Sequence, residues 1–189
     1  MINAARANNI PELERLVATG TDINSKDYVV KTALIWAAQE GHVEVARYLV
    51  GAGADLAASN NRGTTALMFA AMSGHVEVAQ YLVGAGADIA AARPDGMTAL
   101  MGAAQEGHVE VAQCLVKAGA DLAAKDNIGT TALMGAAYNG HVEVARYLVG
   151  AGADLNTARG DGKTALMFAA MNGHVEVAQY LVGAGADLA

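Results

Sequence analysis

Positive charge is in short supply in this chain of 189 residues. It has 12 lysine and arginine residues against 19 aspartate and glutamate residues, which gives a net charge of −7 at pH 7. A chain with this balance has no overall electrostatic attraction for nucleic-acid phosphates or for anionic membrane surfaces. We therefore predict no nucleic-acid partner and no membrane partner.

Cysteine and long apolar runs are scarce as well. Cys114 is the single cysteine and cannot form an internal disulfide, and Met1 to Arg6 lack the basic start and apolar core of a secretion signal. These absences favour a reducing, cytoplasmic setting. Apolar runs such as Ala66 to Met72 stop at Ser73, far short of the about 20 residues that span a bilayer, so we expect no transmembrane segment.

Apolar residues, in contrast, are plentiful and recur regularly. Hydrophobic residues make up 53% of the chain and charged residues 16%, a balance that favours a continuous core over disorder. A Thr-Ala-Leu triplet returns every 33 residues, at 32–34, 65–67, 98–100, 131–133 and 164–166. Each triplet is followed at fixed distances by Ala-Ala, Gly-His-Val-Glu-Val-Ala, Leu-Val and Ala-Gly-Ala-Asp. A period of this length is typical of solenoid proteins.

Six units fill the chain without a linker once an earlier, partial copy from Ile2 to Asp27 is included. We expect one domain over residues 1–189, divided into units 1–27, 28–60, 61–93, 94–126, 127–159 and 160–189. A pair of short helices cannot bury its apolar faces alone, so stability must come from the stacking of neighbouring units.

Each unit predicts a helix, a turn, a second helix and a finger. In the third unit, Thr65 can cap a first helix that Gly74 ends, and Gly86 closes a second helix from about Val76 to Val83. The expected apolar stripe of this second helix consists of Val76, Ala79 and Val83, with Val78 and Leu82 beside them. That stripe must face a neighbouring unit.

The two ends of the array are expected to differ. Asn8-Asn9-Ile10-Pro11 stands where the inner units have Gly-His-Val-Glu, and charged residues nearby make the first unit a polar cap. At the other end, Ala189 follows Gly185 to Leu188 with no closing helix, so the sixth unit should expose a face that its predecessors bury. Either the chain has been truncated or this end packs on something.

These motifs resemble the ankyrin-repeat family, whose unit is a 33-residue turn and helix pair carrying Thr-Pro-Leu-His, Ala-Ala, Gly-His and Gly-Ala-Asp. The resemblance covers the whole chain and implies an all-α ankyrin-repeat solenoid of stacked helix-turn-helix units joined by β-turn fingers. It implies binding of partners on the concave surface made by the fingers and first helices, and no catalysis. The near identity of the units is similar both to consensus-engineered scaffolds and to recently duplicated natural arrays.

The sequence departs from the family pattern at three positions of the unit. Alanines such as Ala66 replace the family's proline, and Ile35 or methionines such as Met68 replace its histidine, which should make the fingers more dependent on apolar packing. Val30 stands where the other inner units have glycine, for example Gly63. Because a β-branched residue is strained at positive φ, we expect the first finger to have a different turn.

Residues that could carry chemistry recur with the repeat, which favours structural roles. The five histidines, which hold one repeat position, are His42, His75, His108, His141 and His174. Stacked helices lie about 8–10 Å apart, whereas each nitrogen on a shared zinc lies about 2 Å from it, so we expect these histidines to satisfy backbone groups at helix starts and turns. Gly160 to Thr164 lacks the earlier glycine of a phosphate-binding loop, and Cys114 replaces a recurring tyrosine. We predict no catalytic residue, metal or cofactor.

Binding is expected where the copies differ, because packing demands one residue type in every inner unit. The predicted partner-binding residues are Tyr28, Lys31, Trp36, Gln39, Glu40, Arg62, Phe69, Met72, Ser73, Asp95, Met97, Gln105, Glu106, Ile128, Tyr138, Asn139, Lys163, Phe168, Met171 and Asn172. Aromatic and methionine side chains dominate interface hot spots, so the expected anchors are Trp36, Phe69, Met72, Tyr138, Phe168 and Met171. Neutral drift, or filling of the core between units, would give the same pattern. Gly102 and Gly135 should leave a recess between these bulky residues.

The sequence therefore predicts a protein–protein interaction scaffold that binds its partner on the concave surface of fingers and first helices. The alternative is an engineered or truncated repeat-stability model, or a structural protein that self-associates through an uncapped C-terminal repeat, with no specific partner.

Overall fold

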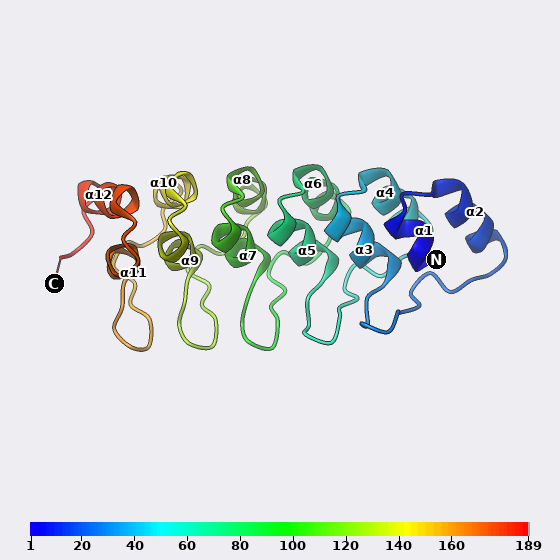
Figure 1. The fold of residues 1–189 in the computed structure, drawn as a ribbon, viewed down its shortest axis with the longest axis horizontal. Helices are drawn as coiled ribbons and strands as arrows, with labels where there is room; N and C mark the ends of the chain where they lie inside the picture. Colours follow the sequence, from blue (N-terminus) through cyan, green and yellow to red (C-terminus); the bar gives the residue numbers. More distant parts are fainter. Residues whose placement is uncertain (189) are drawn as a thin grey trace.

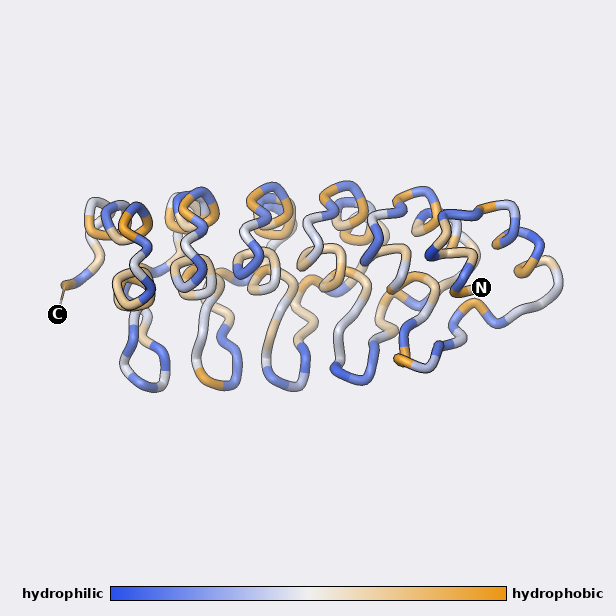
Figure 2. Tube along the Cα trace, viewed as in Figure 1, coloured by the Kyte–Doolittle hydropathy of each residue, from blue (hydrophilic) through white to orange (hydrophobic). Residues whose placement is uncertain are grey.

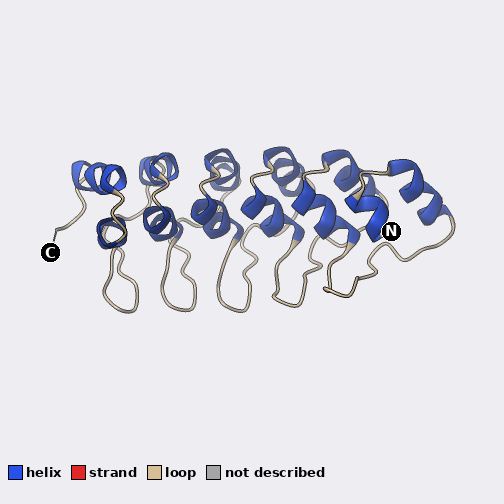
Figure 3. Ribbon diagram, in the orientation of Figure 1, coloured by secondary structure: helices blue, strands red, loops and turns tan. Residues whose placement is uncertain are grey.

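The computed structural model describes residues 1–188, and within them it contains twelve α-helices joined by loops (Figure 3). In chain order the helices are α1 (Ile2–Arg6), α2 (Ile10–Ala18), α3 (Ala33–Glu40), α4 (Val43–Gly51), α5 (Ala66–Ser73), α6 (Val76–Gly84), α7 (Ala99–Glu106), α8 (Val109–Lys117), α9 (Ala132–Asn139), α10 (Val142–Gly150), α11 (Ala165–Met171) and α12 (Val175–Gly183). The expected all-α solenoid of paired helices is confirmed.

The helices form two parallel rows along an elongated molecule (Figure 1). The first helices of the units, α1, α3, α5, α7, α9 and α11, pack on one another in sequence, and the second helices from α4 to α12 do the same. Five fingers project from the row of first helices on the side away from the second helices. They comprise residues 25–31, 58–64, 91–97, 124–130 and 157–163. We call the surface made by these fingers and the first helices α3 to α11 the finger surface.

Threonine and glycine set the limits of the inner first helices, as the sequence predicted. The hydroxyl of Thr65 accepts a hydrogen bond of 3.4 Å from the amide of Met68, and the threonines that precede the other four helices do the same. Gly74 ends α5 in the left-handed region with φ +76°. A helix that begins with a side-chain cap and ends at a left-handed glycine has its outermost amides and carbonyls satisfied.

The buried stripe of each second helix is shifted from the expected one. In α6 the fully buried residues are Val78, Ala79 and Leu82, whereas Val76 and Val83 are only half-buried. Three helices pack on α6, namely α5 of the same unit and the neighbouring second helices α4 and α8, and Val78 and Leu82 belong to the core that they share. The core is consequently one continuous apolar band between the two rows.

The first unit is built differently, as expected of a polar cap. Asn9 replaces the inner histidine and accepts a hydrogen bond of 3.1 Å from the amide of Glu12, which caps α2. Asn8 takes the positive φ that glycine takes in the other units, at +52°. Arg15 pairs with Glu12 at 2.7 Å on the exposed side of α2.

The first finger has the same turn as the others, so the prediction of a different turn at Val30 is wrong. Val30 adopts φ +62°, and its amide donates to the carbonyl of Asp27 at 3.0 Å, as the amide of Gly63 donates to the carbonyl of Asn60. The Asp27 carboxylate also accepts from the amides of Val29 and Lys31 at 3.0 and 2.9 Å. These bonds hold the turn closed although the left-handed region is unfavourable for a β-branched residue.

The sixth unit exposes apolar surface that the inner units bury, as predicted. Val175 is 64% exposed, whereas its equivalent Val142 is half-buried, and Leu166 and Met167 are half-buried where Leu133 and Met134 are buried. The fingers, in contrast, carry mostly hydrophilic residues (Figure 2). The last position of this unit, Ala189, lies outside the described residues.

Candidate functional site

Of the twenty predicted binding residues, nineteen lie on the fingers or on the first helices of units two to six, and Asn172 directly follows α11. They therefore share the finger surface, which runs the length of the molecule from α3 to α11 (Figure 1). Their exposure differs widely, and the surface divides into three regions with different chemistry.

The N-terminal region is a stack of alternating cations and aromatic rings. The guanidinium of Arg6 lies 4.2 Å from the ring centre of Trp36, and the ammonium of Lys31 lies 4.1 Å from the same ring and 4.4 Å from the ring of Phe69. The indole Nε1 of Trp36 donates to Asp27 at 2.7 Å. Two predicted anchors, Trp36 and Phe69, are thus already covered by cations of the chain itself.

Burial and hydrogen bonding set the charges in this stack. Burial lowers the pKa of Lys31, although the Asp27 carboxylate opposes that shift. Burial also works against ionisation of Asp27, but hydrogen bonds from the Lys31 amide, Trp36 and the Val29 amide hold its pKa below the usual value. The stack therefore contains a half-buried carboxylate, Asp27, whose charged form is favoured.

In the middle region, neighbouring side chains fill the recess that was predicted above Gly102 and Gly135. A Cβ at residue 102 would lie 2.7 Å from Cγ of Met72, and one at residue 135 would lie 2.8 Å from Cγ of Gln105. Both glycines are buried. Met72 and Gln105 of the preceding units fill the space that the two glycines leave, so a side chain at either position would have to displace them.

The C-terminal region presents large exposed apolar side chains. Tyr138 is 52% exposed, Ile128 60% and Met171 67%. Phe168, in contrast, is 5% exposed, because its ring packs edge to face with Tyr138 at 6.0 Å between centroids and lies 4.7 Å from the guanidinium of Arg159. Phe168 was predicted as an anchor, but it is a buried packing residue that contacts the exposed ring of Tyr138.

A groove of about 770 Å³ lies between the fourth and fifth fingers, next to this region. Lys125 to Gly129 form one wall and Ala158 to Asp161 the other. Arg159 and Lys163 both pair with Asp161, and hydrogen bonds from these two cations hold its pKa well below the usual value. The groove is mixed in charge, with Ile128 as its apolar member.

The histidines stabilise the contact between units, although not in the way the sequence indicated. None of them caps its own helix. Instead, the ring Nε2 of each histidine lies 2.8–3.1 Å from a main-chain carbonyl oxygen near the end of the first helix of the previous unit. His75, for example, contacts the carbonyl of Gln39 at 2.8 Å. No group of three or more histidine, cysteine, aspartate or glutamate side chains in residues 1–188 is arranged to hold a metal ion.

Two further types of residue behave as structural elements. Asp55, Asp88, Asp121 and Asp154 each accept from the amide two residues later, as turn ligands. Burial raises the pKa of Cys114, against the effect of nearby Lys117, and the thiol is half-buried. A thiol with a raised pKa is a weak nucleophile, which agrees with a packing role.

Sequence reasoning missed several residues that shape this surface. Arg6, Asp27, Arg93 and Arg159 all contact predicted residues. The last three occupy one repeat position, which holds Asp, Asn, Arg, Asp and Arg in successive fingers. Variation at that position was a signal available in the sequence, whereas the contact of Arg6 with Trp36 depends on the stacking of two units.

Stacked helix pairs with projecting fingers define an α-helical repeat protein, a class whose extended surfaces commonly bind other proteins. A family model described as Ankyrin repeats (3 copies) matches residues 1–93, 53–126, 86–159 and 123–189. The chain therefore belongs to the ankyrin-repeat family. Ankyrin repeats generally mediate protein–protein interactions and are in general not enzymes. No curated protein matched the chain. No helix within residues 1–188 has the length and apolar character needed to cross a membrane.

Proposed function

We propose that this chain is a scaffold that binds a protein partner on the finger surface, with the main anchors in units five and six. One observation carries the proposal: the large apolar side chains Ile128, Tyr138 and Met171 are exposed on the finger surface. They occupy positions that differ between copies, whereas positions that recur unchanged are mostly core or turn residues. Exposed aromatic and methionine side chains supply most of the binding energy at interfaces.

The N-terminal region has a different role in this proposal. Because Trp36 and Phe69 are covered by Arg6 and Lys31, this region presents charged side chains to the partner, with Tyr28, 91% exposed, as its large apolar contact, and Tyr138 and its neighbours supply the rest. The remaining predicted residues surround these anchors and exclude water from them. The six units act as one continuous binding domain, in a reducing, cytoplasmic compartment compatible with a lone half-buried cysteine, and without catalysis.

The test uses a partner captured by cross-linking in native extract and then purified. Its affinity is measured for the parent chain, for Ile128→Ala, Tyr138→Ala and Met171→Ala combined, and for Glu77→Ala, Gln80→Ala and Glu110→Ala combined. The second set lies on the second helices, so it is the matched control. We expect the first set to weaken binding by tenfold or more, equivalent to about 1.4 kcal/mol, and the second set to leave it unchanged. Equal affinities for all three chains would exclude the finger surface as the binding site.

Self-association through the sixth unit is a second candidate function, favoured by its exposed face. A groove of about 510 Å³ at α11 and α12 is lined mainly by small and apolar residues, among them Val175 and Val182, together with His174 and Gln179. An exposed apolar surface of this kind marks interaction sites. Light scattering from low to high micromolar concentration, on the parent and on Val175→Lys, tests it: association of the parent alone supports the candidate, and a monomeric parent removes it. The near identity of the units also fits a consensus-like designed array with no partner.

A further inference from the structure

The fingers carry positive charge in an otherwise acidic molecule. Seven of the 12 lysine and arginine residues lie in the five fingers, against four of the 19 acidic residues, so the fingers have a net charge of +3 while the whole chain has −7. Every finger has at least one cation, represented by Lys26, Arg62, Arg93, Lys125 and Arg159.

These cations do not occupy one fixed repeat position. Arg62 is equivalent to Asp95 and Ile128 in later fingers, and Arg93 is equivalent to Asn60 and Asp126. A residue required by packing recurs at the same position in every unit, as the capping threonines do. The cation changes position from finger to finger while each finger keeps one, so the turn itself does not require it.

The finger carboxylates are already engaged within their own fingers. Asp126 accepts from the amides of Ile128 and Thr130 at 3.0 and 2.7 Å, Asp27 makes the equivalent pair of bonds, and Asp161 pairs with Arg159 and Lys163. By contrast, the exposed side chains of Arg62 and Lys125 make no ion pair or hydrogen bond with any residue in the described range 1–188. The unengaged charge on the fingers themselves is therefore positive.

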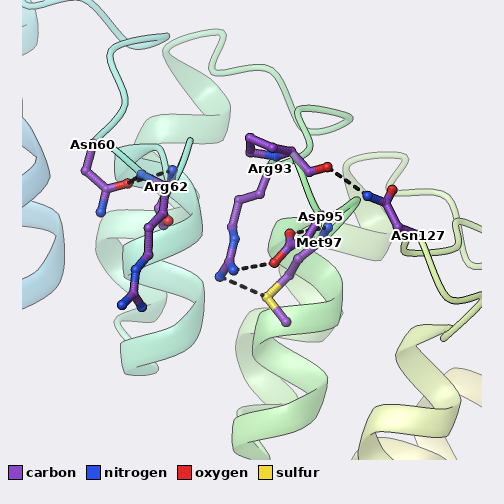
Figure 4. Close-up of polar contacts among 8 residues, drawn as sticks. Asn60, Arg62, Arg93, Asp95, Met97 and Asn127 are labelled. Carbon is purple, nitrogen blue, oxygen red and sulfur yellow. Dashed lines mark hydrogen bonds and ion pairs between the residues drawn. The ribbon is translucent and has the colours of Figure 1, made fainter.

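The side chain of Arg93, on the third finger, is held in position by Asp95 and Met97. Asp95 binds its Nη2, Sδ of Met97 lies 3.4 Å from its Nη1, and its buried Nε has no hydrogen-bond partner within residues 1–188. Figure 4 shows the guanidinium groups of Arg62 and Arg93 reaching to the same side from neighbouring fingers. Asn127 fixes the next finger by donating to the carbonyl of Pro94 at 2.8 Å. The guanidinium of Arg62 can pair with a carboxylate directly, whereas a partner carboxylate at Arg93 would share that guanidinium with Asp95.

We propose that the finger surface recognises an acidic protein segment, whose carboxylates bind Arg62 and Arg93 as the segment crosses the fingers. Adjacent units lie about 10 Å apart and an extended chain advances about 3.3 Å per residue, so carboxylates three residues apart match neighbouring fingers. Charge complementarity of this kind steers the encounter and fixes the register, while Tyr138 and Met171 supply apolar contact. The inference rests on the proposed scaffold function and specifies its partner.

The probe is a fluorescent peptide of about twelve residues with glutamate at every third position and serine or glycine between, compared with peptides carrying glutamine or lysine instead. Fluorescence anisotropy is measured against the parent, Arg62→Gln, Arg93→Gln and the control Lys117→Gln on α8. We expect binding of the glutamate peptide only, weakened about threefold to tenfold by each arginine substitution and by added salt, and unchanged by Lys117→Gln. Arg62→Gln leaves the finger intact, because the Arg62 side chain makes no contact that holds the turn.

Three results would overturn the inference: no binding of the glutamate peptide, equal affinity for the parent and both arginine variants, or tighter and equally arginine-dependent binding of a single-stranded oligonucleotide of the same charge. The affinity of the purified partner for the variants shows whether only the acidic-segment inference fails or the proposed scaffold function fails too. If Tyr138→Ala weakens the partner and Arg62→Gln does not, the acidic segment is excluded and the scaffold stands. If neither change weakens the partner, both are excluded.

Discussion

The ring of His75 joins the third unit to the second through Gln39, whose main-chain carbonyl oxygen lies 2.8 Å from its Nε2. The same contact recurs along the array, and the imidazole also packs against Gly41. Neighbouring units are thus connected both by apolar packing and by a repeated polar contact.

Substitution of His75 by alanine should reduce the free energy of unfolding by about 1–2 kcal/mol, because the carbonyl of Gln39 loses its partner in a half-buried position. The matched variant is His42→Ala, whose 3.1 Å contact with the Arg6 carbonyl is exposed. Urea unfolding of both variants measures the difference. A larger loss for His42→Ala would contradict the role of burial in this contact.

Alanine at Gly74 should destabilise the chain far more than alanine at Gly173. Both glycines have positive φ, +76° and +73°, so both variants incur strain of about 1–2 kcal/mol. A Cβ at residue 74 would also lie 2.6 Å from the ring of His108, whereas one at residue 173 would meet nothing within 4 Å. We expect a total loss of about 3 kcal/mol or more for Gly74→Ala. Equal thermal midpoints for the two variants would rule out this steric explanation.

Val30→Gly should stabilise the protein by about 0.5–1 kcal/mol. The change relieves a β-branched residue at φ +62°, and this gain exceeds the greater chain entropy of glycine in the unfolded state. The reverse change, Gly63→Val, places a side chain 2.6 Å from Cδ of Pro94 and should cost at least about 2 kcal/mol. A thermal midpoint of Val30→Gly below that of the parent would refute strain at this turn.

Asp27 should make stability depend on pH in the acid range. Its pKa in the folded chain lies below the unfolded value of about 3.9, so its contribution is complete above about pH 5 and is lost as the pH falls through the folded pKa. Asp27→Asn removes this dependence and preserves the turn, because Asn60 accepts the same two amide bonds in the next finger. The stability difference between parent and variant, measured by urea unfolding, should shrink from pH 7 to pH 2. A constant difference would exclude this carboxylate as its source.

Phe168 and Tyr138 should separate packing from binding. Phe168→Ala empties a buried site and should reduce stability by about 3 kcal/mol or more, whereas Tyr138→Ala truncates an exposed ring and should reduce it by less than about 1 kcal/mol. Calorimetry of both variants checks the stability difference. Partner affinity should fall with Tyr138→Ala, and a similar stability loss for both rings would mean that Tyr138 is a packing residue too.

The sequence predicted the features that depend on residues close together in the chain. The caps at Thr65 and its equivalents, the left-handed Gly74 and the 33-residue stacking were all confirmed, because each follows from local conformation or from the period. The exposed face of the sixth unit was predicted by the same logic.

Features that depend on contact between units were harder to predict. The Met72 side chain that fills the space at Gly102, the Arg6 side chain that covers Trp36 and the Lys31 side chain that covers Phe69 come from other positions of the repeat. Their reach across the unit boundary is set by side-chain length and rotamer, which periodicity does not describe. Val30 was mispredicted because three hydrogen bonds to Asp27 outweigh a local preference.

The face at α11 and α12 is open within residues 1–188. A repeat array is held together by nearest-neighbour interfaces, and within these residues the first and sixth units each pack on one neighbour, while the sixth leaves Val175 and Val182 in water. Amide exchange should therefore be faster in α2 and α12 than in the central helices. Met171 lies in the sixth unit and Tyr138 in the fifth, so the segment proposed to anchor a partner includes helices that a partner would order.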